Sequence, residues 1–247
     1  MKNLLFLFAF AATLNVVAQE TVLLRVHHKI GDVLLTEQNV SQKMGAQGGM
    51  DMNLLMDKKI IGKDGDTLSI ESKIKTLQMN MLQDGKVLSF DSSKKAGDLD
   101  EMGMMMKAQF APMIAATIIS KMSTTGKVLE TKVEPPTPAM DQFLKQAKGM
   151  TFPQEEVAIS SSWEEETSEQ GMNVKTTYTV TDFEKGKVYI AVTGAVSGLG
   201  EGVIKGNLIV DIETGIKDTE NIEMSINMNG GAAMTISTNS TTKKMEF

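Results

Sequence analysis

The sequence has 247 residues, and its 25 Lys and Arg against 31 Asp and Glu give a formal net charge of −6 at pH 7. The basic residues form no block, which argues against nucleic acid and against an anionic membrane surface as partners, because both require clustered Lys and Arg. The chain contains no cysteine, so it has no disulfide framework and no thiol nucleophile. Methionine is abundant at 20 residues, whereas the aromatic residues are 9 Phe, 2 Tyr and 1 Trp.

The first 18 residues have the pattern of a secretory signal peptide. Lys2 is followed by an apolar run over 4–17, and Val16 and Ala18 form a small-residue cleavage pattern before Gln19. The run is short for a membrane span, which needs ~20 apolar residues. We therefore expect export, and a mature chain without a transmembrane span.

Most of the remaining chain has the pattern of antiparallel β-strands. Residues 216–228 are the clearest case, because apolar and polar residues alternate along them and leave one face apolar. A strand of this length exceeds the usual ~5–6 residues, so it must coil or contain a bulge. The sequence therefore predicts a mainly β fold with long coiled strands.

Two parts of the chain show the same order of turns. In each part a hairpin turns on charged residues around one glycine, Gly65 in the first part and Gly186 in the second. A Thr-Gly pair then precedes a further strand, at 125–126 and at 214–215. These parallels predict two related antiparallel β units, with chance similarity between ordinary hairpins as the alternative.

A connector separates the two units. Three prolines stop a strand at its start, and Met140, Phe143 and Leu144 then share one side of a short helix. The predicted organisation is a signal peptide at 1–18, a first β unit with a methionine-rich helix at 19–134, the connector at 135–150 and a second β unit at 151–247.

The methionine-rich helix is predicted at 99–118. Asp98 is suited to be its N-cap, with Glu101 three residues later as in a capping box. Pro112 removes one backbone hydrogen bond and should kink the helix. The apolar residues that recur at helical spacing, and that form the candidate lining of a ligand site, are Leu99, Met102, Met106, Phe110 and Met113.

This methionine cluster has three possible roles. Core filling is the simplest, because a helix that is apolar nearly all round is normally buried. A lid or groove lining is the second, because methionine adapts to varied apolar partners. Cu(I) binding is the third, but the helix places Met104 and Met105 away from Met102 and Met106, so the sulfur atoms do not converge. We expect no metal and no cofactor.

The sequence identifies no catalytic residue. His27 and His28 are neighbours on a predicted first strand at 21–30, so their side chains point to opposite faces and cannot bind one ion together. The sequence contains no HExxH and no GxSxG motif, and the glycines at 194–206 match no nucleotide-binding loop. The acidic runs at 98–101 and 164–166 lack the ligand spacing of a calcium loop.

One stretch carries a family resemblance. The segment FPQEEVAISSSWEEE, at 152–166, resembles an uncharacterised family of exported β-rich bacterial proteins of Bacteroidetes type, a domain of unknown function. In that family a glycine often stands two residues before the tryptophan, where this sequence has Ser161. The resemblance implies the periplasm or cell envelope of a Gram-negative bacterium, and it supplies no functional residues. Trp163 is most simply a core anchor of the second unit.

The expected function is therefore that of a non-catalytic, exported cell-envelope protein that binds an apolar ligand or a partner protein on a concave β surface. A lipid or an apolar peptide is the expected ligand. The alternative is a hydrolase with carboxylate chemistry that no motif reveals, since any two of the 31 Asp and Glu could meet in the fold.

Export predicts a specific mature N-terminus. Protein purified from its native host should begin at Gln19 or within a few residues of it, because Val16 and Ala18 occupy the positions that signal peptidase reads. Intact-mass measurement checks this directly. Recovery of a chain that starts at Met1 would contradict it.

Overall fold

The structure is a computed structural model, and it describes residues 20–45, 48–83, 85–136, 140, 144, 149–169 and 171–246. The predicted signal peptide at 1–18 lies outside the described residues. So do residues 137–139, 141–143 and 145–148 of the predicted connector at 135–150. Met140 and Leu144, which are described, are both helical.

The described residues form a mainly β fold with one antiparallel sheet of twelve strands. The strands are β1 Val33–Met44, β2 Gly48–Asp64, β3 Thr67–Gln83, β4 Lys86–Asp91, β5 Thr117–Ser123, β6 Val128–Glu134, β7 Ser162–Glu169, β8 Met172–Glu184, β9 Lys187–Gly198, β10 Gly200–Asp211, β11 Lys217–Met228 and β12 Ala233–Lys244. The order across the sheet is β6-β5-β3-β2-β1-β12-β11-β10-β9-β8-β7, and β4 pairs with the C-terminal part of β3.

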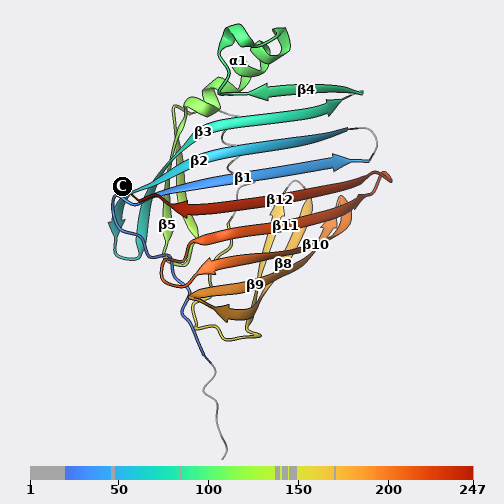
Figure 1. Cartoon of the computed structure of the whole chain (residues 1–247). Coiled ribbons are helices and arrows are strands. Elements are labelled where there is room, and N and C mark those ends of the chain that lie inside the picture. The colour runs from blue at the N-terminus through green and yellow to red at the C-terminus, as the bar shows by residue number, and fades with distance from the viewer. Residues whose placement is uncertain are drawn as a thin grey trace, which may run out of the picture.

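The sheet is strongly curved, as expected for strands of this length. β2 and β3 have 17 residues each, and their pairing shifts register between Leu55 and Met56 and again between Ile60 and Gly62. Such bulges bend a strand and increase its twist. As a result β5 and β8 run behind the layer that β1, β2, β12 and β11 form in Figure 1.

Both predicted hairpins form tight turns at the expected glycines. β2 and β3 are joined by Gly65 and Asp66, with Gly65 at φ 53°. β8 and β9 are joined by Lys185 and Gly186, at φ 53° and 76°. Positive φ at the centre of a two-residue turn matches the twist of the flanking strands, which is why glycine is favoured there.

The two halves of the chain meet in the middle of the sheet, where β1 pairs with β12 from Leu34–Lys244 to Met44–Met234. One continuous sheet therefore holds both predicted units. The main core lies on the concave face and draws residues from both halves, among them Ile60 and Leu68 from the first half and Val188 and Ile190 from the second.

The residues before β1 do not form the predicted first strand. Residues 20–32, here called the N-terminal strap, are extended but make a single isolated bridge, between Val22 and Val157. Leu24 and Val26 are nevertheless buried in the main core. The alternation that suggested a strand is therefore real, but the segment covers the concave face instead of joining the sheet.

The strap is held through backbone groups of both halves. The Val26 N–H donates to Thr124 O at 2.7 Å, and the His27 N–H donates to Thr214 O at 2.8 Å. Thr124 directly precedes the first Thr-Gly pair, at 125–126, and Thr214 belongs to the second, at 214–215. Gly31 N–H also donates to Ile60 O at 2.8 Å.

The helix α1 spans Glu101–Ala115, within the predicted range of 99–118. Its N-cap is Asp100 instead of Asp98, and the Asp100 carboxylate accepts from the Gly103 N–H at 2.7 Å. The helix stops at Ala115 because β5 begins at Thr117 and pairs with both β3 and β6. α1 contacts β3 and β4 and lies at the end of the sheet next to β4 (Figure 1).

The curvature predicts a strict requirement for glycine at position 206. Gly206 lies in β10 opposite Ile222, and a Cβ there would collide with the carbonyl oxygen of Asn221. Gly206→Ala should lower the free energy of unfolding by about 1–3 kcal/mol, the usual cost of overpacking. Urea unfolding measures this. Gly230→Ala is the control, because no atom lies within 4 Å of its Cβ position, and equal losses in both variants would contradict the argument.

Candidate functional site

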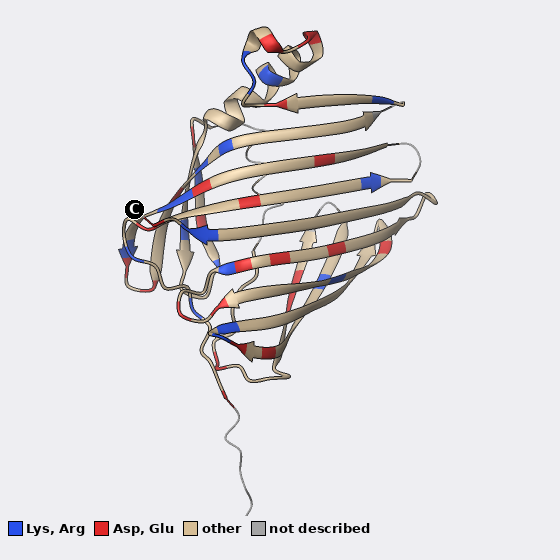
Figure 2. Ribbon diagram, in the orientation of Figure 1, with Lys and Arg blue, Asp and Glu red and all other residues tan. Residues whose placement is uncertain are grey.

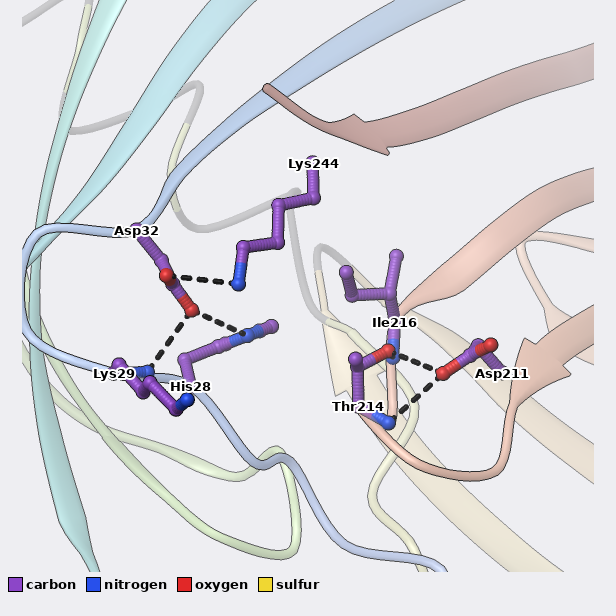
Figure 3. A network of polar contacts seen from close by, with 7 residues as sticks. All are labelled: His28, Lys29, Asp32, Asp211, Thr214, Ile216 and Lys244. Carbon is purple, nitrogen blue, oxygen red and sulfur yellow. Dashed lines mark hydrogen bonds and ion pairs between the residues drawn. The ribbon is translucent and has the colours of Figure 1, made fainter. Parts of the chain in front are cut away.

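The buried histidine is the first candidate for chemistry. His28 is 6 % exposed and belongs to the N-terminal strap, whereas His27 is exposed. His28 Nδ1 lies 3.9 Å from Asp32 Oδ2 and has no hydrogen-bond partner among the described residues (Figure 3). Burial lowers the pKa of His28. The negative charge of Asp32 opposes this decrease, and the positive charge of Lys244 adds to it.

Asp32 is occupied by structural contacts. Its carboxylate accepts from the Lys29 N–H at 2.9 Å and pairs with the Lys244 amine at 2.9 Å, which ties the strap to the last strand (Figure 3). A histidine that acts as a general base must reach a substrate proton. His28 is enclosed, so its position does not favour this role, and Asp32 fastens the strap through the Lys29 N–H and the Lys244 amine.

The acidic run at 164–166 is also accounted for by structural contacts. Glu164 and Glu166 face outward and pair with Lys175. Glu165 points the other way, and its carboxylate accepts from the Thr151 N–H at 2.7 Å and from the Tyr178 hydroxyl at 3.2 Å. Trp163 stacks on Tyr178 with ring centroids 5.4 Å apart, and it packs against the main core as expected for an anchor.

The charges are dispersed over the surface. Figure 2 shows acidic and basic residues interspersed along the strands. Within the part of the chain that the structure describes, no group of three His, Asp or Glu side chains is placed to hold a metal ion. No helix in the same residues is long and apolar enough to cross a membrane.

The predicted lining residues of α1 divide into a buried and an exposed group. Met106 and Met113 are buried, and Phe110 is half-buried with its ring 5.4 Å from that of Phe90 on β4. Met102 is 41 % exposed. Leu99 is half-buried and precedes the helix. The helix thus packs mainly at the β3–β4 edge of the sheet. None of the five residues lines either of the cavities described next.

A cavity of about 180 Å³ lies on the concave face of the first half. It is lined by Thr36, Gln38, Leu54, Met56, Lys58, Ser72, Ile118, Ser120 and Leu144. Alternating positions of β1, β2, β3 and β5 supply all of these except Leu144, which comes from the connector. The walls are therefore apolar side chains with hydroxyl and amide groups between them, together with one amine.

Lys58 is the unusual member of this set. The preceding residues of β2 on the same face are all apolar, and Lys58 stands directly opposite Leu34 on β1 and Ser72 on β3. Its amine has no ion pair or hydrogen bond within the described residues. Burial lowers the pKa of Lys58 to about 8; the charge of Lys217 adds to the decrease and Glu220 opposes it.

An apolar track leads along β2 to this amine. It consists of the alternate residues Met50, Met52, Leu54 and Met56, with Lys58 at its end. Leu54 is buried, while the three methionines are partly buried against the second core cluster. The track was not predicted from the sequence, because the predicted lining was placed on the methionine-rich helix and not on β2. The signal was available in the period-2 spacing of these residues and in the lysine that follows in the apolar register.

A second depression, of about 230 Å³, lies mainly on the outer face and is polar. Its lining is Asn39, Val40, Ser41, Asp51, Met52, Asn53, Gln78, Asn80 and Asn239. Several of these groups bond to each other: the Asn53 amide donates to Asn39 Oδ1 at 2.6 Å and to Glu37 Oε1 at 3.2 Å. Their donors and acceptors are thus largely used within the sheet.

Residues 137–243 match the model of a family of unknown function, DUF6263. The match covers most of the connector and nearly all of β7 to β12, which includes the segment on which the sequence resemblance rested. A family without an assigned function is therefore confirmed for this part of the chain, whereas Bacteroidetes type and export stay predictions. No curated protein matches the chain.

The buried histidine predicts a pH dependence of stability. Because its pKa is lowered in the folded state, the unfolded chain takes up a proton at His28 more readily than the native one. The free energy of unfolding should therefore fall as the pH is lowered through the unfolded value of about 6.5. His28→Gln should flatten this decrease between about pH 7.5 and 5, above the range in which Asp32 titrates.

Urea unfolding at a series of pH values measures this effect. His27→Gln, at the exposed neighbour, is the matched control and should keep the wild-type slope. An unchanged slope in His28→Gln would show that the enclosed imidazole does not cause the acid sensitivity.

Proposed function

We propose that the protein is a non-catalytic, exported cell-envelope protein that binds an apolar ligand on the concave face of its sheet. The observation that carries this proposal is the apolar track on β2, which leads into a cavity between the sheet and Leu144. Methionine side chains are flexible and polarisable, so they adapt to ligands of varied shape. An extended lipid chain fits such a track better than a compact molecule does.

The competing functions have less support. A hydrolase needs two ionisable groups that converge where a substrate can reach them. The carboxylates considered above are instead engaged by backbone donors and lysines, and the one buried histidine of the described residues is enclosed. An apolar peptide would bind on the same track, but strand addition would require a free edge, and β2 is paired on both sides.

We further propose that the two halves of the sheet arose by duplication of one β unit. Two related β units, at 19–134 and 151–247, would explain why both halves use the same hairpin turns. They would also explain why both place a Thr-Gly turn against the N-terminal strap. The predicted export is consistent with this role, because apolar ligands that cross the periplasm need a carrier to shield them from water.

The proposal predicts binding of an uncharged apolar probe. Delipidated protein should enhance the fluorescence of N-phenyl-1-naphthylamine. The double variant Met52→Gln and Met56→Gln should bind it roughly tenfold more weakly, since full burial of a methionine side chain contributes about 1.5–3 kcal/mol and these two are partly buried before the probe binds. Leu55→Gln is the matched control, because Leu55 is half-buried on the opposite face of the same strand.

Fluorescence titration gives the affinities. No binding by the wild-type protein would refute the carrier function, and an equal loss in the Leu55→Gln control would assign the effect to the strand and not to the track.

A further inference from the structure

We propose that Lys58 binds the head group of an amphiphile with one acyl chain and one negative charge, whose chain lies along the apolar track. This inference rests on the proposed carrier function and adds the chemical class of the ligand. The geometry that supports it is a single amine at one end of a row of apolar residues, in a cavity of about 180 Å³.

Lys58 differs from the other lysines near the concave face because it lacks a partner. The Lys217 amine pairs with Glu220 at 2.9 Å, and the Lys244 amine pairs with Asp32 at 2.9 Å. Within the described residues no carboxylate or carbonyl group contacts the Lys58 amine. Lys58 is half-buried. An ammonium that is partly removed from water without a partner is destabilised, and an anion in the cavity would offset this cost.

The groups around Lys58 suit an anionic head group. Ser72 and Ser120 supply hydroxyls and Gln38 supplies an amide, and each of these can donate a hydrogen bond to an oxyanion. The cavity lining contains no carboxylate that would repel an anion among the described residues. One amine matches one negative charge, which favours a carboxylate or a phosphodiester over a doubly charged phosphate.

The dimensions favour a single chain. From Met50 to Lys58 the track measures about 26 Å, at ~3.3 Å per strand residue, which accommodates one extended acyl chain. The cavity itself is smaller than the ~300–1,000 Å³ of typical small-molecule pockets. It therefore holds the head group and the first carbons, while the remaining carbons contact Leu54, Met52 and Met50.

The amine also predicts how binding depends on pH. The pKa of Lys58 is about 8, with Lys217 and Glu220 on β11 as the charged groups that influence it. Above this pH the amine loses its charge, so the affinity for an anion should fall while the affinity for an uncharged analogue stays constant. Lys217 and Glu220 are paired to each other, and their opposite charges largely offset.

The experiment compares three ligands with the same chain: dodecanoate, 1-dodecanol and lauroyl lysophosphatidylglycerol. Each displaces N-phenyl-1-naphthylamine from the delipidated protein. Lys58→Met should weaken dodecanoate binding at least tenfold, which corresponds to about 1.4 kcal/mol, and leave 1-dodecanol binding unchanged. Lys58→Arg should retain most of the affinity for the anion.

Lys59→Met is the matched control, because Lys59 is the next residue of β2, is exposed and points to the outer face. Binding of 1-dodecanol by Lys58→Met also shows that this variant is folded. A selective loss of lysophosphatidylglycerol alone would support the head-group site and identify the source as a phospholipid. The inference is overturned if Lys58→Met binds both anions like the wild type, or if it loses all three ligands equally. If the wild-type protein binds none of the three, the carrier function fails as well.

Discussion

The pairing of β1 with β12 is the contact on which the rest of the structure depends. It joins the two halves of the chain into one sheet and leaves neither strand with a free edge, which would otherwise be a site for aggregation. Its register is marked by a row of amides that crosses six neighbouring strands on the outer face. The row consists of Gln78, Asn53, Asn39, Asn239, Asn221 and Asn207. A slip of one residue would break this row and turn the apolar face of a whole strand toward water.

A curved sheet of twelve strands has a concave face that must be covered. Because α1 packs mainly on β3 and β4, much of this cover comes from segments outside α1. The N-terminal strap closes one part through Leu24 and Val26, and Phe152 and Val157 pack beside it. Met140 and Leu144 close another part. The methionines of β2 stay partly accessible, and the candidate ligand cavity lies between the sheet and Leu144.

Much of the fold could be predicted from the sequence, because local patterns determine it. The alternation in β11 and the glycines at 65 and 186 depend on residues close in sequence, and the structure has a strand and two hairpins there. The strap could not be distinguished from a strand, because both bury alternate residues. Its partners, Thr124 and Thr214, are far away along the chain, and the pattern of one segment contains no information about them.

The candidate site was predicted less well, for a related reason. The methionines of α1 are clustered in sequence, so the ligand site was predicted there. A strand presents only every second residue to one face, so the methionines of β2 are spread out along the sequence. Met50, Met52, Leu54 and Met56 share one face of β2, although Asp51, Asn53 and Leu55 stand between them in sequence. Lys58 shows the same limitation, since its position in the apolar register is visible in the sequence but its lack of a partner is a property of the tertiary structure.

The state of Lys58 connects the stability of the protein to its ligand. Its folded pKa of about 8 lies below the ordinary value of 10.5. Between these two values the unfolded chain holds more protons than the native one, so the free energy of unfolding rises with pH there, and the full penalty is present below about pH 8. The free protein therefore keeps an uncompensated charge at neutral pH. An anion that pairs with the amine removes this penalty, so an anionic amphiphile stabilises the fold by more than contact with the apolar track alone provides.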